Sequence, residues 1–240
     1  MYKIYIDAGH GGIDSGGTGF SRKEKNDALK MAQAIYKLLK TQSDFTPILS
    51  RNSDINKDLN KRISEANTQK CSYYLSIHRD AFNNKTANGT SIYVYSQASD
   101  KTIKFAKNII NNVLAVTDFY NRGLKFGAPN YTNFAVNRDT NMPACLFEIG
   151  FITNENDNAI FDKKFEQIAL AITVAICENF GIKYDDETEK NVYKVQSGDN
   201  LTEIAKKYKT TVNELVKINK KKYPTITANF IRTNWNLKVR

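Results

Sequence analysis

The chain alternates short apolar runs with longer segments in which apolar residues recur every three or four positions. Short apolar runs between turn residues predict buried strands, and the spacing of three and four predicts amphipathic helices. The predicted strands are residues 2–7, 46–50, 73–78, 91–95 and 144–148, with a weaker strand at 131–136. The predicted helices are residues 24–40, 58–69, 100–116 and 165–180. Over residues 1–183 this alternation predicts an α/β fold, with a mostly parallel or mixed sheet flanked by helices.

A polar segment at residues 184–191 interrupts this pattern and predicts an acidic, solvated linker between two domains. Beyond it, residues 192–240 follow the order strand, helix, helix, strand, which predicts a small α+β (βααβ) domain. Its elements are expected at residues 192–196, 201–208, 212–219 and 236–239. Thr211 and Glu214 form a capping box that should begin the second of these helices.

The chain carries a net charge of +10, most of it near the C-terminus. Residues 192–240 contain eleven Lys or Arg and three Asp or Glu, a difference of +8. A basic segment of this kind predicts a polyanionic partner, which could be nucleic acid, an anionic membrane surface or an anionic cell wall. Nucleic acid is disfavoured, because the positive excess does not surround the two histidines that are the candidates for catalysis.

The three cysteines, Cys71, Cys145 and Cys177, are odd in number and widely spaced, and two of them lie in apolar runs. We therefore expect reduced, buried side chains rather than a disulfide framework. The chain opens directly on a predicted strand, and no run approaches the roughly 18 apolar residues of a membrane span. We expect synthesis in the cytoplasm without a signal peptide, and no insertion into a membrane.

The two histidines, His10 and His78, each fall at the carboxyl end of a predicted strand. Because α/β proteins bind ligands at that edge of a parallel sheet, the two equivalent positions indicate a shared site rather than two ordinary loop histidines. Neutral imidazole is a common zinc ligand, and a hydrolytic zinc site combines three protein ligands with a water. A third ligand is expected among the nearby carboxylates, which are Asp7, Asp14, Glu24, Asp80 and Glu148.

Two of these carboxylates have competing explanations. Glu24 begins a predicted helix after a glycine-rich loop, and spacing alone favours a role at the positive end of the helix dipole over metal binding. Glu148 ends an apolar strand, where a carboxylate is costly unless something pairs with it. Its partner is either a metal-bound water or one of three arginines, Arg51, Arg62 and Arg138.

Four segments, in this order and spacing, resemble the zinc N-acetylmuramoyl-L-alanine amidases of the amidase-3 family. They are residues 7–12 (DAGHGG), 24–25 (EK), 76–78 (SIH) and 142–154 (MPACLFEIGFITN). The resemblance covers residues 1 to about 182. It implies that His10, Glu24 and His78 bind zinc, which reverses the preference for a helix-terminal role of Glu24.

The same resemblance implies that Glu148 is the catalytic carboxylate. Arg79 and Asp80 depart from the family pattern, which more often has a small residue and Asn after the second histidine. The metal site is unaffected by this departure, but substrate contacts at residues 79 and 80 cannot be carried over from the family.

Residues 192–240 resemble a LysM domain, a module that binds glycans containing N-acetylglucosamine. The matching segments are residues 193–201 (YKVQSGDNL), 204–208 (IAKKY) and 212–219 (VNELVKIN). Residues 232–235 (RTNW) depart from it, since a Pro-Gly turn is common there. The resemblance implies a sugar groove between the loops at residues 198–202 and 223–226. The implied contact residues are Gly198, Asp199, Asn200, Leu201, Tyr223 and Ile226.

Together the resemblances imply a zinc-dependent hydrolase of the amide bond between N-acetylmuramic acid and L-alanine in bacterial peptidoglycan. Residues 1–183 would form the amidase domain, 184–191 the linker and 192–240 the wall-binding domain. The expected absence of a signal peptide favours a phage endolysin that acts at the cell wall. The alternatives are a bacterial autolysin of the same activity and a non-catalytic peptidoglycan-binding protein.

Overall fold

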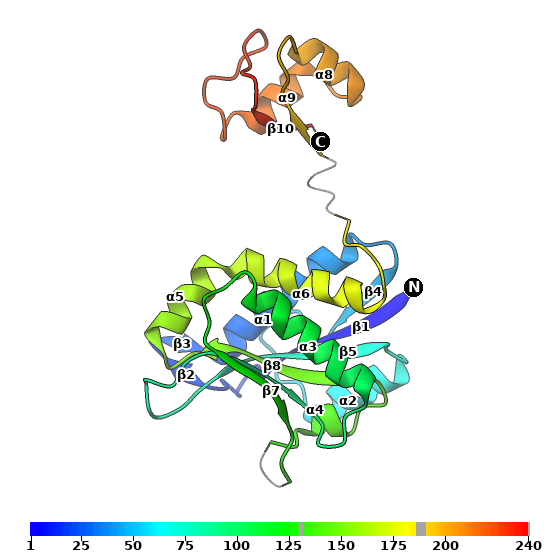
Figure 1. Ribbon diagram of the computed structural model, residues 1–240, viewed down its shortest axis with the longest axis vertical. Coiled ribbons are helices and arrows are strands. Elements are labelled where there is room, and N and C mark those ends of the chain that lie inside the picture. Colours follow the sequence, from blue (N-terminus) through cyan, green and yellow to red (C-terminus); the bar gives the residue numbers. More distant parts are fainter. Residues whose placement is uncertain (130–131, 186–190, 240) are drawn as a thin grey trace. The chain divides into compact units, whose positions relative to one another are not determined.

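The computed structural model describes residues 1–129, 132–185 and 191–239, and the chain forms two compact units, Met1–Tyr184 and Asp185–Arg240 (Figure 1). Most of the predicted linker, residues 186–190, lies outside the described residues. No helix in the described part of the chain is both long enough and apolar enough to span a bilayer.

The first unit is built on a six-stranded sheet with the order β4-β1-β5-β8-β6-β7. Strands β4, β1, β5 and β8 are parallel, whereas β6 pairs antiparallel with β8 and parallel with β7. The strands are β1 (Tyr2–Ala8), β4 (Phe45–Leu49), β5 (Tyr73–Asp80), β6 (Thr90–Val94), β7 (Asn121–Phe126) and β8 (Ala144–Phe151). This confirms the α/β fold with a mixed sheet, and it brings the carboxyl ends of β1, β5 and β8 to one edge.

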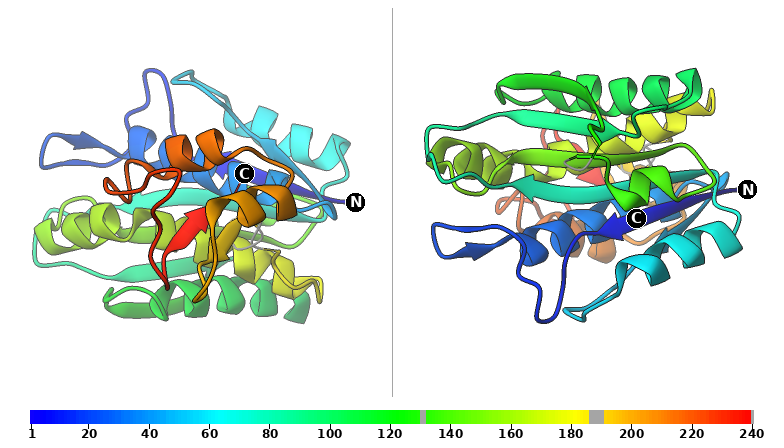
Figure 2. Two further views of the ribbon diagram at one scale, coloured as in Figure 1. Left: turned by 90° about the horizontal axis from the view of Figure 1, so that it is seen from above. Right: turned by 90° about the horizontal axis from the view of Figure 1, so that it is seen from below.

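Helices cover both faces of the sheet (Figure 1). Helices α1 (Glu24–Lys40), α3 (Asp100–Leu114) and α6 (Phe165–Asn179) bury the larger hydrophobic cluster on one face. Helices α2 (Leu59–Thr68) and α4 (Ala135–Arg138) cover the opposite face, which is turned to the viewer in the right panel of Figure 2. The faces differ because side chains alternate along each strand.

The alternation of side chains along β8 puts Glu148 and Cys145 on opposite faces of the sheet. Cys145 and Phe147 point into the larger cluster, while Leu146 packs on the other face. Glu148 shares the face of Leu146 and is therefore directed away from Cys145, as predicted. All three cysteines of the chain are free and buried, which confirms that prediction as well.

The structure departs from the sequence predictions at one predicted strand and at elements that were not predicted. The weak strand at residues 131–136 is wrong, because residues 135–138 form helix α4; Tyr131 itself lies outside the described residues. Strand β7 and helix α5 (Glu155–Lys163) were not predicted. A hairpin of two short strands, β2 (Thr18–Gly19) and β3 (Arg22–Lys23), leads into α1 and was also not predicted.

The second unit has the predicted order of strand, helix, helix and strand. It consists of β9 (Val192–Lys194), α8 (Leu201–Lys207), α9 (Val212–Asn219) and β10 (Asn236–Lys238), with β9 and β10 paired antiparallel. Its small core includes Leu215 and Leu237, both fully buried. The hydroxyl of Thr211 accepts a hydrogen bond from the Glu214 N–H at 3.1 Å, which is the predicted N-terminal cap of α9.

Candidate metal and catalytic site

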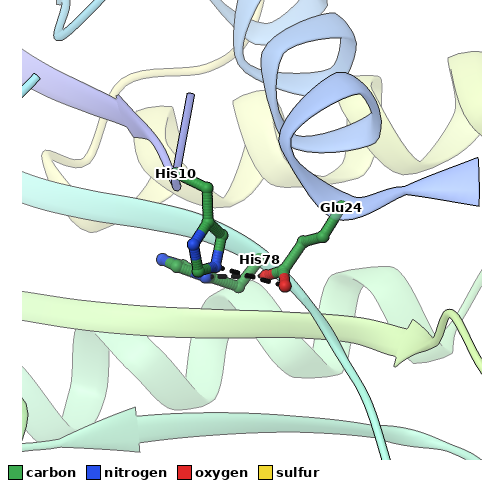
Figure 3. A group of neighbouring side chains, drawn as sticks. All are labelled: His10, Glu24 and His78. Carbon is green, nitrogen blue, oxygen red and sulfur yellow. Dashed lines mark hydrogen bonds and ion pairs between the residues drawn. The ribbon is translucent and has the colours of Figure 1, made fainter. Parts of the chain in front are cut away.

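Three of the predicted site residues converge at the carboxyl edge of the sheet (Figure 3). His10 follows β1, His78 belongs to β5, and Glu24 is the first residue of α1. The Glu24 carboxylate lies between the imidazoles, with Oε2 at 3.2 Å from His10 Nε2 and Oε1 at 2.8 Å from His78 Nδ1. One potential ligand atom from each residue lies within 4.8 Å of the other two.

The Glu24 carboxylate is held by the backbone as well as by the imidazoles. Its Oε2 accepts the N–H of Gly17 at 2.7 Å, and its Oε1 accepts the N–H of Arg79 at 3.0 Å. The loop before α1 therefore folds back onto the sheet edge, so that a helix-terminal glutamate faces the histidines. Both predicted roles of Glu24, first helical residue and member of the histidine cluster, are compatible in this geometry.

The backbone around the cluster is unusually constrained. A methyl group at Gly9 would lie 2.4 Å from the His78 ring, and one at Gly16 would lie 2.5 Å from the Glu24 carboxylate. His10 has a φ of 58°, in the left-handed region that is costly for a residue with a side chain. Such strain persists only where the surroundings fix it, and it is common at functional sites.

Asp14 orients His10 from the other side of the ring. Its Oδ2 lies 2.8 Å from His10 Nδ1, which leaves Nε2 directed at Glu24. Burial lowers the pKa of His10, but the hydrogen bonds and charges of Glu24 and Asp14 outweigh burial and raise it to about 8. Metal-binding histidines commonly have a carboxylate on the second nitrogen. Asp14 was a candidate third ligand, and the structure places it on His10 instead of among the three clustered residues.

The donor set suits a zinc ion. Two imidazole nitrogens and one carboxylate are the usual protein ligands of hydrolytic zinc sites, which leave a position open for water or substrate. The imidazoles hold the pKa of Glu24 well below its usual range despite its burial, so the carboxylate is ionised, as a metal ligand must be.

Glu148 lies directly beside this cluster, because it is paired in register with His78 across β5 and β8. Its Oε2 is buried and has no hydrogen-bond partner. Burial, followed by the negative charges of Glu24 and Asp80, raises the pKa of Glu148 well above its ordinary value. A carboxyl group that resists ionisation in a cavity is suited to carry a proton.

None of the three candidate arginines pairs with Glu148. Arg62 forms a buried ion pair with Asp7 at 2.5 Å, and Arg51 donates to the backbone carbonyls of Ala8 and Gly9. Arg138 is paired with Asp139 at 2.7 Å. The buried salt bridge considered for Glu148 is therefore excluded.

Asp7 and Asp80 do not join the histidine cluster. Asp7 is fully engaged by Arg62, Tyr74 and Ser76 beneath the sheet edge. Asp80 follows a bulge in β5, and its Oδ1 accepts the N–H of Ala81 at 2.8 Å. Desolvation is the main reason that the pKa of Asp80 is raised.

Arg79 has a structural role that explains its departure from the family pattern. Its side chain is 1% exposed and points to the opposite face of β5 from His78. There it pairs with Asp27 at 2.9 Å, donates to Asn158 at 2.7 Å and stacks over the Phe161 ring at 4.2 Å. The Arg79 side chain therefore supports the packing of α1 and α5 on β5.

The histidine cluster and Glu148 line one cavity of about 560 Å³. This volume lies within the usual range for small-molecule sites. Its walls include two segments that sequence reasoning did not place at the site, residues 56–59 at the start of α2 and residues 134–136 at the start of α4. A periodic pattern predicts where a helix lies along the chain but not which part of the fold it lies against.

In the second unit, the predicted sugar contacts lie in the β9–α8 turn and in the loop after α9. Gly198 has a φ of 90°, Asp199 accepts the Gln196 N–H at 2.7 Å, and Asn200 caps α8. The side chains of Leu201 and Ile226 are buried in the core, so these two residues can offer only backbone atoms to a sugar.

Tyr223 stacks on Trp235 with ring centroids 4.2 Å apart and an angle of 8° between the rings. Trp235 belongs to the segment that departs from the LysM pattern. Its stacking shows that this segment is packed against the loop after α9.

Comparisons with known proteins agree with this geometry. Residues 4–178 match the family model described as N-acetylmuramoyl-L-alanine amidase, and residues 193–239 match the LysM domain. The sporulation-specific N-acetylmuramoyl-L-alanine amidase of Bacillus subtilis (strain 168) is 34% identical over 82% of this chain and 75% of its own. An endolysin of Bacillus phage SPP1 is 31% identical, over 67% of this chain and 58% of its own.

The first unit also matches solved structures of amidases. The catalytic domain of CwlV, an N-acetylmuramoyl-L-alanine amidase from Bacillus (Paenibacillus) polymyxa var. colistinus, has a TM-score of 0.70 and 32% identity. The match covers 76% of this chain and 100% of that domain. The family model, the curated relatives and the shared fold lead to one assignment: the chain belongs to the N-acetylmuramoyl-L-alanine amidase family and carries a C-terminal LysM domain.

Proposed function

We propose that this peptidoglycan amidase depends on zinc, which His10, Glu24 and His78 bind, and that Glu148 is its catalytic carboxylate. The bond hydrolysed joins the lactyl group of N-acetylmuramic acid to L-alanine. The observation that carries the proposal is the histidine and glutamate cluster, which lines the same cavity as a buried carboxylate without a partner.

The chemistry divides between the metal site and Glu148. When zinc is bound, the site gains a Lewis acid that favours ionisation of water near neutral pH and polarises an amide carbonyl. Glu148 removes the proton from the attacking water and returns it to the leaving amine, for which its raised pKa is suited. No covalent intermediate is required, and Cys145 on the opposite face of β8 has no access to the cavity.

Replacing the catalytic carboxylate by its neutral isostere tests this assignment. Glu148→Gln should keep the fold and the bound zinc while hydrolysis of a soluble muramyl peptide falls by at least about a hundredfold, the usual scale for a general base. Glu166→Gln, on the exposed surface of α6, is the matched control and should retain wild-type turnover. Near wild-type hydrolysis by Glu148→Gln would show that another group moves the proton.

Metal content provides a separate test. The purified protein should contain a single zinc per chain, and a chelator should lower the melting temperature, because a ligand that binds only the native state stabilises it. His78→Ala should contain no zinc and should melt at the same temperature with and without chelator. A wild-type melting temperature that ignores chelator would contradict a tight zinc site at these residues.

For the second unit, we propose binding to N-acetylglucosamine-containing glycan between the turn at residues 198–202 and the loop at residues 223–226. These two segments contain Gly198, Asp199, Asn200 and Tyr223. The side chains of Leu201 and Ile226 are buried, so these two residues would contribute backbone atoms only. The match of residues 193–239 to the LysM domain supports this assignment.

The biological setting that we propose is phage-induced lysis of a bacterium. The similarity to the endolysin of Bacillus phage SPP1 supports it, while the similarity to the sporulation-specific amidase supports the alternative of a bacterial autolysin. Transcription in the source cell separates the two settings. An endolysin gene should be transcribed only after phage infection or induction, whereas transcription during growth or sporulation without phage would identify an autolysin.

A further inference from the structure

Two buried polar groups without partners lie next to each other in the catalytic unit. Among the described residues, three buried side-chain atoms lack a hydrogen-bond partner: Ser91 Oγ, Asn137 Oδ1 and Glu148 Oε2. Ser91 and Glu148 are directly opposite each other in the antiparallel pair of β6 and β8. Unpaired buried polar atoms are rare in folded proteins, so a juxtaposed acceptor and hydroxyl point to an interaction between them.

The sheet directs both side chains to the same face. Directly opposite residues of an antiparallel pair share a face, with Cβ atoms about 4.5–5.5 Å apart. The neighbouring pair, Ile92 and Phe147, packs into the larger cluster on the other face. Ser91 is fully buried, whereas Glu148 lines the catalytic cavity. The serine hydroxyl therefore lies on the protein side of the carboxylate, away from the space where a substrate binds.

Strand β6 also fixes the backbone of Glu148. The hydroxyl of Thr90 donates to the Glu148 carbonyl at 2.6 Å. Two consecutive β6 residues thus flank Glu148, with Thr90 on its backbone and Ser91 facing its side chain. This arrangement leaves the carboxylate little freedom except rotation of its own side chain.

The nearby cationic groups are engaged elsewhere. The guanidinium of Arg79 is occupied by Asp27 and Asn158, and Lys125 Nζ lies 3.4 Å from the Tyr93 hydroxyl. Both lower the pKa of Glu148 through charge alone and donate no hydrogen bond to it. The Ser91 hydroxyl, which can donate one proton, is the donor that the register places opposite Glu148.

We propose that Ser91 is a positioning residue for Glu148, and this rests on the catalytic role proposed above. Ser91 Oγ and Glu148 Oε2 are not hydrogen-bonded to each other in the structure, and a rotation of either side chain or one ordered water lets the hydroxyl donate to Oε2. This contact holds the carboxyl group in a single rotamer, with Oε1 directed into the cavity toward the proton that it must accept. A carboxylate free to rotate would spend less time in reacting geometry, which lowers turnover without changing substrate binding.

The test compares Ser91→Ala with Ser91→Thr, which retains the hydroxyl, on a soluble muramyl peptide. Ser91→Ala should lower kcat about tenfold or more, the scale of a lost hydrogen bond to a charged group, with KM and zinc content unchanged. Ser91→Thr should recover most of this loss. In the Glu148→Gln background, Ser91→Ala should add little further loss, because residues that act through one group are not additive.

Thr173→Val on α6 is the control for loss of a buried hydroxyl, since Thr173 is fully buried and donates only to the Ala169 carbonyl. If Ser91→Ala does not fold, Ser91→Cys decides, because a thiol of similar size is a weak donor and should give an intermediate kcat. Wild-type kcat in folded Ser91→Ala, or in folded Ser91→Cys, would overturn the proposal. So would a loss from Ser91→Ala in the Glu148→Gln background as large as its loss in the wild-type background. Failure of the wild-type enzyme to hydrolyse the substrate would instead refute the proposed function itself.

Discussion

Asp7 and Glu148 are carboxylates of one sheet with opposite environments, Asp7 fully buried and Glu148 half-buried beside the cavity. Asp7 is surrounded by donors, and although burial raises its pKa, the charge and hydrogen bonds of Arg62 outweigh burial and lower it. Glu148 has no donor on Oε2, and its pKa is raised. Environments that separate the pKa values of neighbouring acids mark their roles. Asp7 is therefore a permanent anion that supports the fold, while Glu148 can exchange a proton.

The Asp7 and Arg62 pair makes a prediction about acid stability. Asp7→Asn leaves a buried guanidinium without its counter-charge and should destabilise the unit by about 3–5 kcal/mol at pH 7. The folded pKa of Asp7 lies below its unfolded value of about 3.9, so its contribution is complete above that pH and is lost as pH falls toward the folded pKa.

Denaturant unfolding of wild type and Asp7→Asn should therefore differ most near neutral pH and converge below about pH 4. The control is Asp139→Asn, which removes an exposed partner of Arg138 and should have little effect on stability. A constant difference between wild type and Asp7→Asn from pH 7 to pH 3 would contradict this account.

At the level of single side chains, the sequence was most informative where residue type restricts chemistry. Only two histidines occur in the chain, and both lie in the cluster. Arg62 was considered as a partner of Glu148, but it pairs with Asp7. Choosing among several arginines requires the register of β1 against β5 and the position of α2, which residue spacing does not contain.

Helices and buried strands were predicted well where their apolar pattern is strong, and poorly where packing rather than pattern decides. Helix α1 has the predicted bounds, residues 24–40. Strand β7 lies at the edge of the sheet with mostly exposed or half-buried residues, so it lacks a continuous apolar run. Around residue 135, alternating Phe134 and Val136 imitate a strand, but both pack on the smaller hydrophobic cluster under α2 and α4, from the N-cap and first turn of α4.

Arg79 links its own strand, β5, to helices α1 and α5. Its loss should therefore lower stability more than catalytic turnover. Its planar guanidinium contacts Asp27 on α1, Asn158 on α5 and the Phe161 ring. A lysine cannot reproduce the forked donors or the stacking, so Arg79→Lys should destabilise the first unit by about 2–4 kcal/mol. Zinc content and turnover at low temperature should be retained, because only the backbone N–H of residue 79 touches Glu24.

Chemical unfolding of Arg79→Lys checks this expectation. Arg138→Lys is the matched control, since Arg138 forms an exposed pair with its sequence neighbour and should tolerate lysine without a measurable change. Unchanged stability in Arg79→Lys would show that the buried arginine is dispensable. Lost zinc in a folded variant would show instead that the side chain organises the metal site.

In the whole molecule, most of the net positive charge and the proposed catalytic residues lie in different units. All proposed metal and catalytic residues belong to residues 1–184, whereas +8 of the net charge belongs to residues 192–240. We therefore expect residues 1–183 alone to hydrolyse soluble muramyl peptides at the full-length rate. Loss of the second unit should reduce lysis of whole cell walls much more, because tethering raises the local concentration of substrate.

Assays of residues 1–183 and of the full-length chain on both substrates test this division of labour. Wall binding by the full-length chain should weaken in part as salt rises, since exposed charges are screened over about 8 Å at physiological ionic strength. Binding through the sugar groove should resist salt. An equal loss of activity on both substrates after truncation would show that the second unit is part of the catalytic fold.

The distribution of two rare residue types gives each unit its own spectroscopic reporter. All three cysteines are buried in the first unit, where desolvation raises the pKa of Cys71 and Cys177 to about 11, so they should react slowly with thiol reagents until that unit opens. The single tryptophan, Trp235, is stacked on Tyr223 in the second unit. Thiol labelling therefore follows opening of the amidase domain alone, while indole fluorescence follows the LysM domain alone, in one sample of unmodified protein.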